Sequence, residues 1–160
     1  MTYLQVVKTI ESIAQSMPLI KTTKNWTPQE WLNYNSVPVL PICLFNIDRG
    51  QVNIGREQKY EIVFWFIDKS GAEGEFEPQV ISDQHQIMND MVSRLRMGSN
   101  PYTIDNQISW TALSDKHEDY YAGVTMTLNL SIVSDFGACD VPIILNGYGI
   151  FDDSFDLSFN

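Results

Sequence analysis

Apolar and polar residues alternate over a long stretch of the chain, "GVTMTLNLSI" at 123–132. A period of two is typical of a β-strand that buries one face and leaves the other polar. We therefore predict a strand over 121–133, with its apolar face packed against helices. The apolar positions of this strand are Val124, Met126, Leu128, Leu130 and Ile132.

A period of three to four residues predicts two amphipathic helices. The first covers residues 3–16 and ends before Pro18, which cannot continue a helix. The second opens near Pro78 and runs to about residue 96, where two arginines suit the negative end of the helix dipole. We expect its apolar face, including Met88 and Met91, to lie in the core.

A short helix is predicted in "NWTPQEWLNY", because Thr27 and Glu30 have the spacing of a capping box and Pro28 suits the first helical position. Its aromatic residues have two interpretations. Packing against the core is the simpler one, and an aromatic ligand groove is the alternative. The residues concerned are Trp26, Trp31 and Tyr34.

Three further segments have strand character. "VPVLPICLFNIDRG" and "QKYEIVFWFIDKSG" are rich in β-branched and aromatic residues, and we expect them to pair antiparallel. The intervening "RGQVNIGRE" reads as a turn or loop, and Pro38 and Pro41 place the start of the first strand at a sheet edge or bulge. Residues 108–114 should form a hairpin with 121–133.

The predicted order is helix, short helix, two strands, helix and a two-strand hairpin. This order indicates an α+β domain over 1–135, with an antiparallel or mixed sheet of about four strands and two main helices on one face. Residues 136–160 are both apolar and acidic, so we expect a C-terminal arm that docks on its own domain or on a neighbouring subunit.

The chain is acidic, with a formal net charge of −10 over 160 residues. Residues 97–160 hold one lysine against nine acidic residues, a balance of −8. Tight binding to nucleic-acid phosphates is not expected, because that affinity comes from Lys and Arg. No apolar run approaches the ~20 residues of a spanning helix, so no membrane contact is expected. The start of the chain does not resemble a secretory signal.

Residues that could carry chemistry are few. The two histidines, His85 and His117, and the two cysteines, Cys43 and Cys139, are far apart in sequence and lie in no metal-binding or nucleophile motif. Two cysteines also fit a reducing compartment rather than a disulfide framework. We therefore expect no enzyme activity, no catalytic residue, no metal and no cofactor.

The element order and several short strings resemble the tail-terminator and tail-completion proteins, the neck-ring or head–tail connector proteins of tailed bacteriophages. The strings are "VPVLPICLF", "ISDQHQIMNDMVSRLR" and "DYYAGVTMTLNLSIVSDFGACD" followed by "VP". The last is similar to the ends of such proteins in phages of Bacteroidetes, including crAss-like phages. The resemblance covers about residues 1–142.

The resemblance implies a virion structural protein that forms a ring of six or twelve subunits in the neck or tail. Such a ring contacts portal, neck and tail proteins, assembles in the host cytoplasm and lets DNA pass without sequence-specific binding. We expect acidic side chains at the channel or rim, with Glu73, Glu75 and Glu77 as candidates. The alternative is an acidic, non-viral binding module with an aromatic pocket.

The arm is the predicted contact between subunits. The residues predicted to make this contact are Phe136, Ile143, Ile144, Leu145, Tyr148, Phe151, Phe155 and Phe159.

Overall fold

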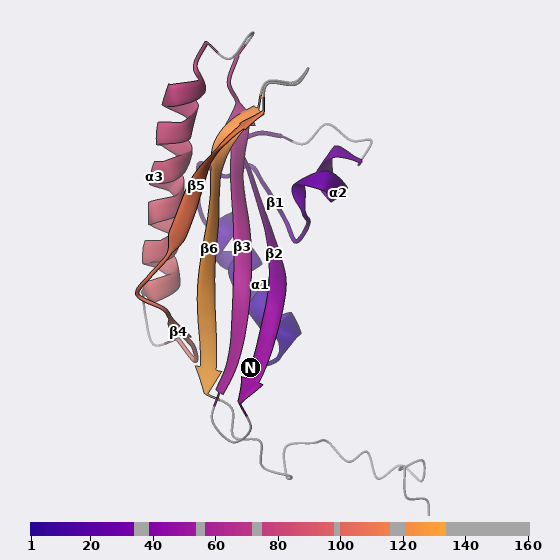
Figure 1. Cartoon of the computed structure of the whole chain (residues 1–160), viewed down its shortest axis with the longest axis vertical. Coiled ribbons are helices and arrows are strands. Elements are labelled where there is room, and N and C mark those ends of the chain that lie inside the picture. Colours follow the sequence, from indigo (N-terminus) through magenta and orange to yellow (C-terminus); the bar gives the residue numbers. More distant parts are fainter. Residues whose placement is uncertain (34–38, 54–56, 72–74, 98–99, 116–120, 134–160) are drawn as a thin grey trace, which may run out of the picture.

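The structure is a computed structural model, which describes residues 1–33, 39–53, 57–71, 75–97, 100–115 and 121–133. The described residues form three helices and six strands (Figure 1). The helices are α1 (Tyr3–Gln15), α2 (Pro28–Leu32) and α3 (Glu77–Arg96). The strands are β1 (Thr22–Lys24), β2 (Ile42–Asn53), β3 (Glu57–Lys69), β4 (Thr103–Ile104), β5 (Ser109–Asp115) and β6 (Tyr121–Val133).

The strands form one mixed sheet with β3 at its centre (Figure 1). Strand β3 pairs antiparallel with β2 on one side and, along its whole length, with β6 on the other. Strand β1 pairs parallel with the start of β2, whereas β4 and β5 pair antiparallel with different parts of β6. The α+β class, the β2–β3 pairing and the β5–β6 hairpin are thus confirmed.

The sheet has six strands where about four were expected. The two additional strands, β1 and β4, are three and two residues long. A run this short cannot display an alternation of apolar and polar residues, so periodicity does not predict it. Backbone pairing with β2 and β6 makes these segments strands.

The main core lies between one face of the sheet and the helices α1 and α3. Helix α1 contributes Ile10 and Ala14, and α3 contributes Ile87, Met88 and Met91. All five apolar residues of the alternating stretch in β6 lie in this core, none more than 2% exposed. The prediction that two main helices cover one face is confirmed.

The short helix α2 lies on the opposite face of the sheet. Its capping box is formed as predicted, since the Thr27 hydroxyl accepts from the Glu30 amide and a Glu30 carboxylate oxygen accepts from the Thr27 amide. Trp31 is buried in a second cluster with Ile42, Leu44 and Ile67, which alternate along β2 and β3 with residues of the main core. Tyr34 lies outside the described residues.

Two sequence expectations for the β2–β3 region are corrected. Residues 49–53 and Glu57 belong to the paired strands, so the loop between them is shorter than the nine residues of "RGQVNIGRE". The start of β2 is also not an edge, because β1 covers it. Pro41 precedes the strand and takes part through its carbonyl, which accepts from the Lys21 amide at 2.9 Å.

Gly123 in β6 is required by a close approach of two backbones. A Cβ at this position would lie 1.8 Å from the carbonyl oxygen of Phe66 on β3. We predict that Gly123→Ala lowers the free energy of unfolding by ~3 kcal/mol or more, the upper range for overpacking. Chemical denaturation monitored by circular dichroism measures this.

Gly50→Ala is the matched control, because a Cβ there would meet its nearest atom at 3.8 Å, an ordinary contact. We expect the unfolding free energy of this variant to change by less than ~1 kcal/mol. Equal stability of the two variants would contradict the steric explanation.

Candidate functional site

The face of the sheet opposite α1 and α3 is called the open face. It is polar over the half that α2 does not cover. It carries every second residue of β2, β3 and β6, those that alternate with the core. The polar residues of β6 on this face match the polar face that the alternation predicts, but β2 and β3 add charges beside them. The polar residues of this face include Asn46, Arg49, Gln51, Asn53, Glu57, Lys59, Glu61, Thr125, Thr127, Asn129 and Ser131.

A β-bulge determines which charges reach this face. The register of β2 shifts between Ile47 and Arg49, so that Ile47 pairs with Ile62 and Arg49 pairs with Glu61. Asp48 is the additional residue, and every residue after it lies on the opposite face from the one that simple alternation predicts. The bulge therefore places Arg49 directly opposite Glu61 on the open face.

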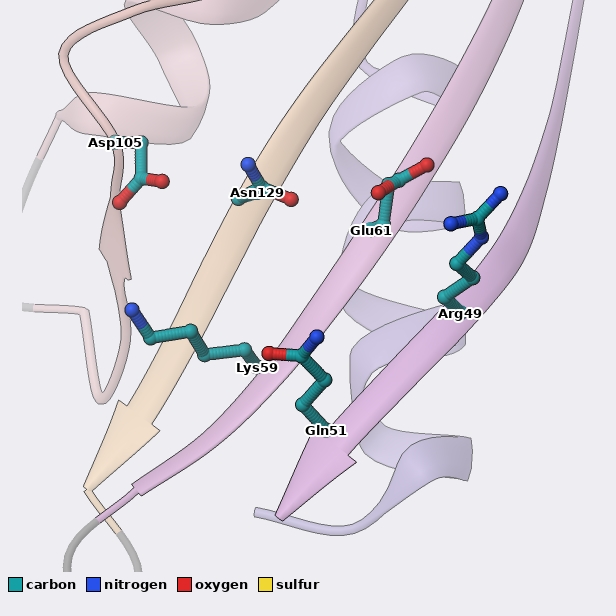
Figure 2. A pocket seen from close by; sticks show the side chains of 6 residues that line it. All are labelled: Arg49, Gln51, Lys59, Glu61, Asp105 and Asn129. Carbon is teal, nitrogen blue, oxygen red and sulfur yellow. The ribbon is translucent and has the colours of Figure 1, made fainter. Parts of the chain in front are cut away.

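This face contains a cleft of about 290 Å³. Figure 2 shows side chains of both charge signs around it, with Lys59 extending across β6 toward the segment that carries Asp105. The cleft spans β2, β3, β6 and the residue that follows β4. It is lined by Arg49, Gln51, Lys59, Glu61, Asp105 and Asn129.

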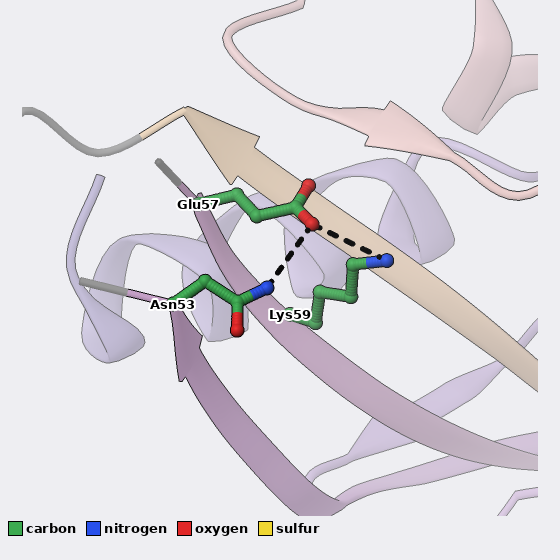
Figure 3. A network of polar contacts seen from close by, with 3 residues as sticks. All are labelled: Asn53, Glu57 and Lys59. Carbon is green, nitrogen blue, oxygen red and sulfur yellow. Dashed lines mark hydrogen bonds and ion pairs between the residues drawn. The ribbon is translucent and has the colours of Figure 1, made fainter. Parts of the chain in front are cut away.

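The ion pairs near this cleft are exposed and local. Arg49 pairs at 3.4 Å with Asp48, its neighbour in sequence, and the Arg49 side chain is 75% exposed. Glu57 Oε1 lies 3.3 Å from Lys59 Nζ and also accepts a bond from Asn53 Nδ2 at 3.4 Å (Figure 3). Exposed ion pairs of this kind contribute only ~0–1 kcal/mol to folding stability. Arg49 and Lys59 can therefore exchange these partners for groups of another molecule at little cost.

Two of the acidic residues predicted at a channel or rim, Glu75 and Glu77, lie at the start of α3. Glu75 is exposed just before the helix, and Glu77 is its half-buried first residue. Glu73 lies outside the described residues, as do Cys139 and all the residues predicted for the arm. Those assignments therefore stay predictions.

The four tryptophans lie on both faces of the sheet. Trp26, Trp31 and Trp65 belong to the cluster around α2, in which Trp31 contacts Tyr121 with ring centroids 5.0 Å apart. Trp110 is 47% exposed and lies 4.5 Å from the ring of His85 on α3. None of them lines the polar cleft.

Within the described part of the chain, no group of three or more His, Cys, Asp or Glu side chains is arranged to hold a metal ion. No helix of that part is both long and apolar enough to cross a membrane. No known family model matches the chain, and no curated protein matches it.

Cys43 lies within the main core, fully buried beside Phe45 and the residues of β3. Burial raises the pKa of its thiol well above the ordinary value, because the thiolate would lose its hydration. Since the thiolate is the reactive form, this cysteine should be inert in the folded protein.

We predict that a Cys139→Ser variant, in which Cys43 is the remaining thiol, reacts with an aromatic disulfide reagent at pH 8 only after denaturant is added. The measurement is thiol release in native buffer and in guanidinium. The matched Cys43→Ser variant reports the reactivity of Cys139 in the same assay. Rapid labelling of native Cys139→Ser protein would contradict the burial of Cys43.

Proposed function

We propose that this protein is a structural component of a tailed-phage virion, which assembles into a homo-oligomeric ring in the neck or tail and surrounds the channel for DNA. One observation carries the proposal: the sheet has two long edges to which no described strand is paired. The resemblance of the sequence to tail-terminator and tail-completion proteins gives the proposal its biological setting.

The first open edge belongs to β2. Strand β1 pairs only with Ile42–Leu44, so β2 from Phe45 to Asn53 has a neighbour on just one side within the described residues. The second open edge is the outer side of β5, which among these residues pairs with β6 alone. Long unpaired edges invite pairing with another chain, and proteins normally cover them.

The two edges lie on opposite sides of the sheet, because β2 and β5 are separated by β3 and β6. A contact that joins one edge region to the opposite edge region of the next subunit is heterologous. Repetition of such a contact with a fixed rotation gives a ring when the rotation closes. The predicted arm at 136–160 would cover an edge or a neighbouring subunit in the same assembly.

The charge of the chain supports a channel that does not hold DNA. A net charge of −10 with ten Lys and Arg residues repels phosphates on average. Acidic side chains such as Glu75 and Glu77 at the start of α3 would line the channel or its rim. DNA would then pass without sequence-specific contacts, and the binding partners would be portal, neck and tail proteins that join the ring in the host cytoplasm.

The alternative, an acidic non-viral module with an aromatic pocket, has less support. The polar cleft of the open face is lined by charged and amide side chains. Trp31 belongs to α2 and is buried against the sheet, and Trp65 packs against the same cluster. These rings stabilise the attachment of α2 to the sheet.

We predict that the purified protein forms a closed ring of six or twelve copies, visible by negative-stain microscopy and measurable as a native mass.

Deletion of 143–160 should leave the domain folded, with an unchanged circular dichroism spectrum, and should weaken ring or neck assembly. A monomer at all concentrations, including in the presence of portal protein, would contradict the ring. Normal assembly of the truncated protein would contradict the role of the arm alone.

A further inference from the structure

The open edge of β2 begins at the end of the sheet where the chain leaves β6. Val133, the last residue of β6, pairs with Glu57 at the start of β3, and Glu57 pairs with Asn53 at the end of β2. The arrowheads of β2 and β6 accordingly lie at the same end in Figure 1. From Asn53 back to Phe45, the outer side of β2 has no neighbour among the described residues.

The other open edge, that of β5, is farther from this point. Strand β5 pairs with the first half of β6, from Tyr121 to Thr127. Strand β4 pairs with β6 closer to its end, at Leu130 and Ser131. Thr127 lies six residues before Val133, which is about 20 Å along a strand. The outer side of β2 is therefore the nearer open edge for a segment that follows β6.

The chain that follows β6 is long enough to reach the β2 edge. A position beyond β2 is three strand spacings from β6, about 14 Å. Residues 134–140 can span up to about 24 Å when extended. Strands β2 and β6 both run antiparallel to β3, so a segment that turns back after β6 runs antiparallel to β2. Length and direction thus permit residues from 141 onward to pair with this edge.

The sequence beyond this connection has the pattern of a β-hairpin. Two apolar runs, "VPIIL" at 141–145 and "YGIF" at 148–151, are separated by Asn146 and Gly147. Asn-Gly is the preferred two-residue hairpin turn, because both of its positions need a positive φ. One face of such a hairpin is apolar and carries Ile143, Leu145, Tyr148 and Ile150.

The end of β2 offers an apolar side chain to this face. Val52 lies in one row with Gln58 and Ile132, and Ile132 belongs to the main core. Val52 thus faces the helix side of the sheet, yet it is 59% exposed. One more strand beside β2, with its apolar side chains on the helix side, would cover Val52 and extend the core.

We propose that residues 141–151 form a β-hairpin on the outer side of β2 in the same subunit, with 141–145 antiparallel to β2. The apolar face lies on the helix side when Val141 is opposite Val52, and this register places Ile144 opposite Arg49. Tethering favours the subunit's own hairpin over that of another copy. A connection of seven residues gives an effective concentration on the order of 1 mM, above the micromolar concentrations of a typical protein solution.

This inference concerns a single subunit and does not require the ring. The hairpin would extend the sheet beyond β2, so that 148–151 become the outermost strand on that side. That side is one of the two edge regions of the proposed ring contact.

The first test is a disulfide in the full chain. In a Cys139→Ser background, Arg49→Cys and Ile144→Cys would place two thiols opposite each other, with Cβ atoms about 5 Å apart. Mild oxidation should give an intramolecular disulfide, seen as a faster monomer on a non-reducing gel and identified by peptide mass spectrometry. The matched control replaces Arg49→Cys by Thr111→Cys, on β5 at the opposite edge, and should give no such disulfide.

The second test, backbone hydrogen exchange in the full chain, assumes no register. Those amides of 45–53 that point away from β3 should be protected in the wild type. Ile143→Asp with Leu145→Asp should raise their exchange rates at least tenfold, because two charges on the apolar face oppose docking. The amides of β5 should be unaffected. The matched variant Phe155→Asp with Phe159→Asp, outside the hairpin, should exchange like the wild type.

The outcomes separate the hairpin from its alternatives. Unchanged exchange of 45–53 in I143D/L145D would overturn the hairpin, as would a loss of protection in β5 instead. A disulfide that joins two chains would place the arm on a neighbouring subunit and overturn the assignment to the same one. If protection of 45–53 is lost but no disulfide forms, the register is wrong and the hairpin stands. None of these measurements needs self-association, so failure of the ring is observed separately.

Discussion

The pairing of β3 with β6 is the constraint on which the rest of the structure depends. The two strands are in register over their full length, from Glu57 opposite Val133 to Lys69 opposite Tyr121. Because side chains alternate along both strands, one register determines which residues meet the helices and which face outward. A shift of β6 by one residue against β3 would move Met126 out of the core, away from Phe64, so the buried face strongly specifies this pairing.

The open face results from the same constraint, with one local exception. In β3 and β6 its residues are those left over when the core has been filled, and they include the charges Lys59 and Glu61. In β2 the bulge at Asp48 inverts the alternation, which brings Arg49 to the open face. Arg49 therefore lines the polar cleft because β2 carries one residue more than its partner strand.

The proposed ring depends on the edges of the sheet and not on its faces. The ring draws on the open edges of β2 and β5, where unpaired backbone groups favour another chain. The polar cleft, whose side chains carry both charge signs, lies on the face of the sheet between these edges.

The sequence by itself determined α1, α3 and β6, whose side chains repeat with a clear period, and also α2, whose start is marked by the capping box of Thr27 and Glu30. Periodicity reports burial of a face, so it predicts long elements and which of their residues are inside. It could not predict β1 or β4, which are defined by backbone pairing with distant strands, or the bulge at Asp48, which depends on the β2–β3 register. The polar cleft was missed for the same reason: Arg49 and Asp105 are far apart in the chain, and only the tertiary structure places them around a common space.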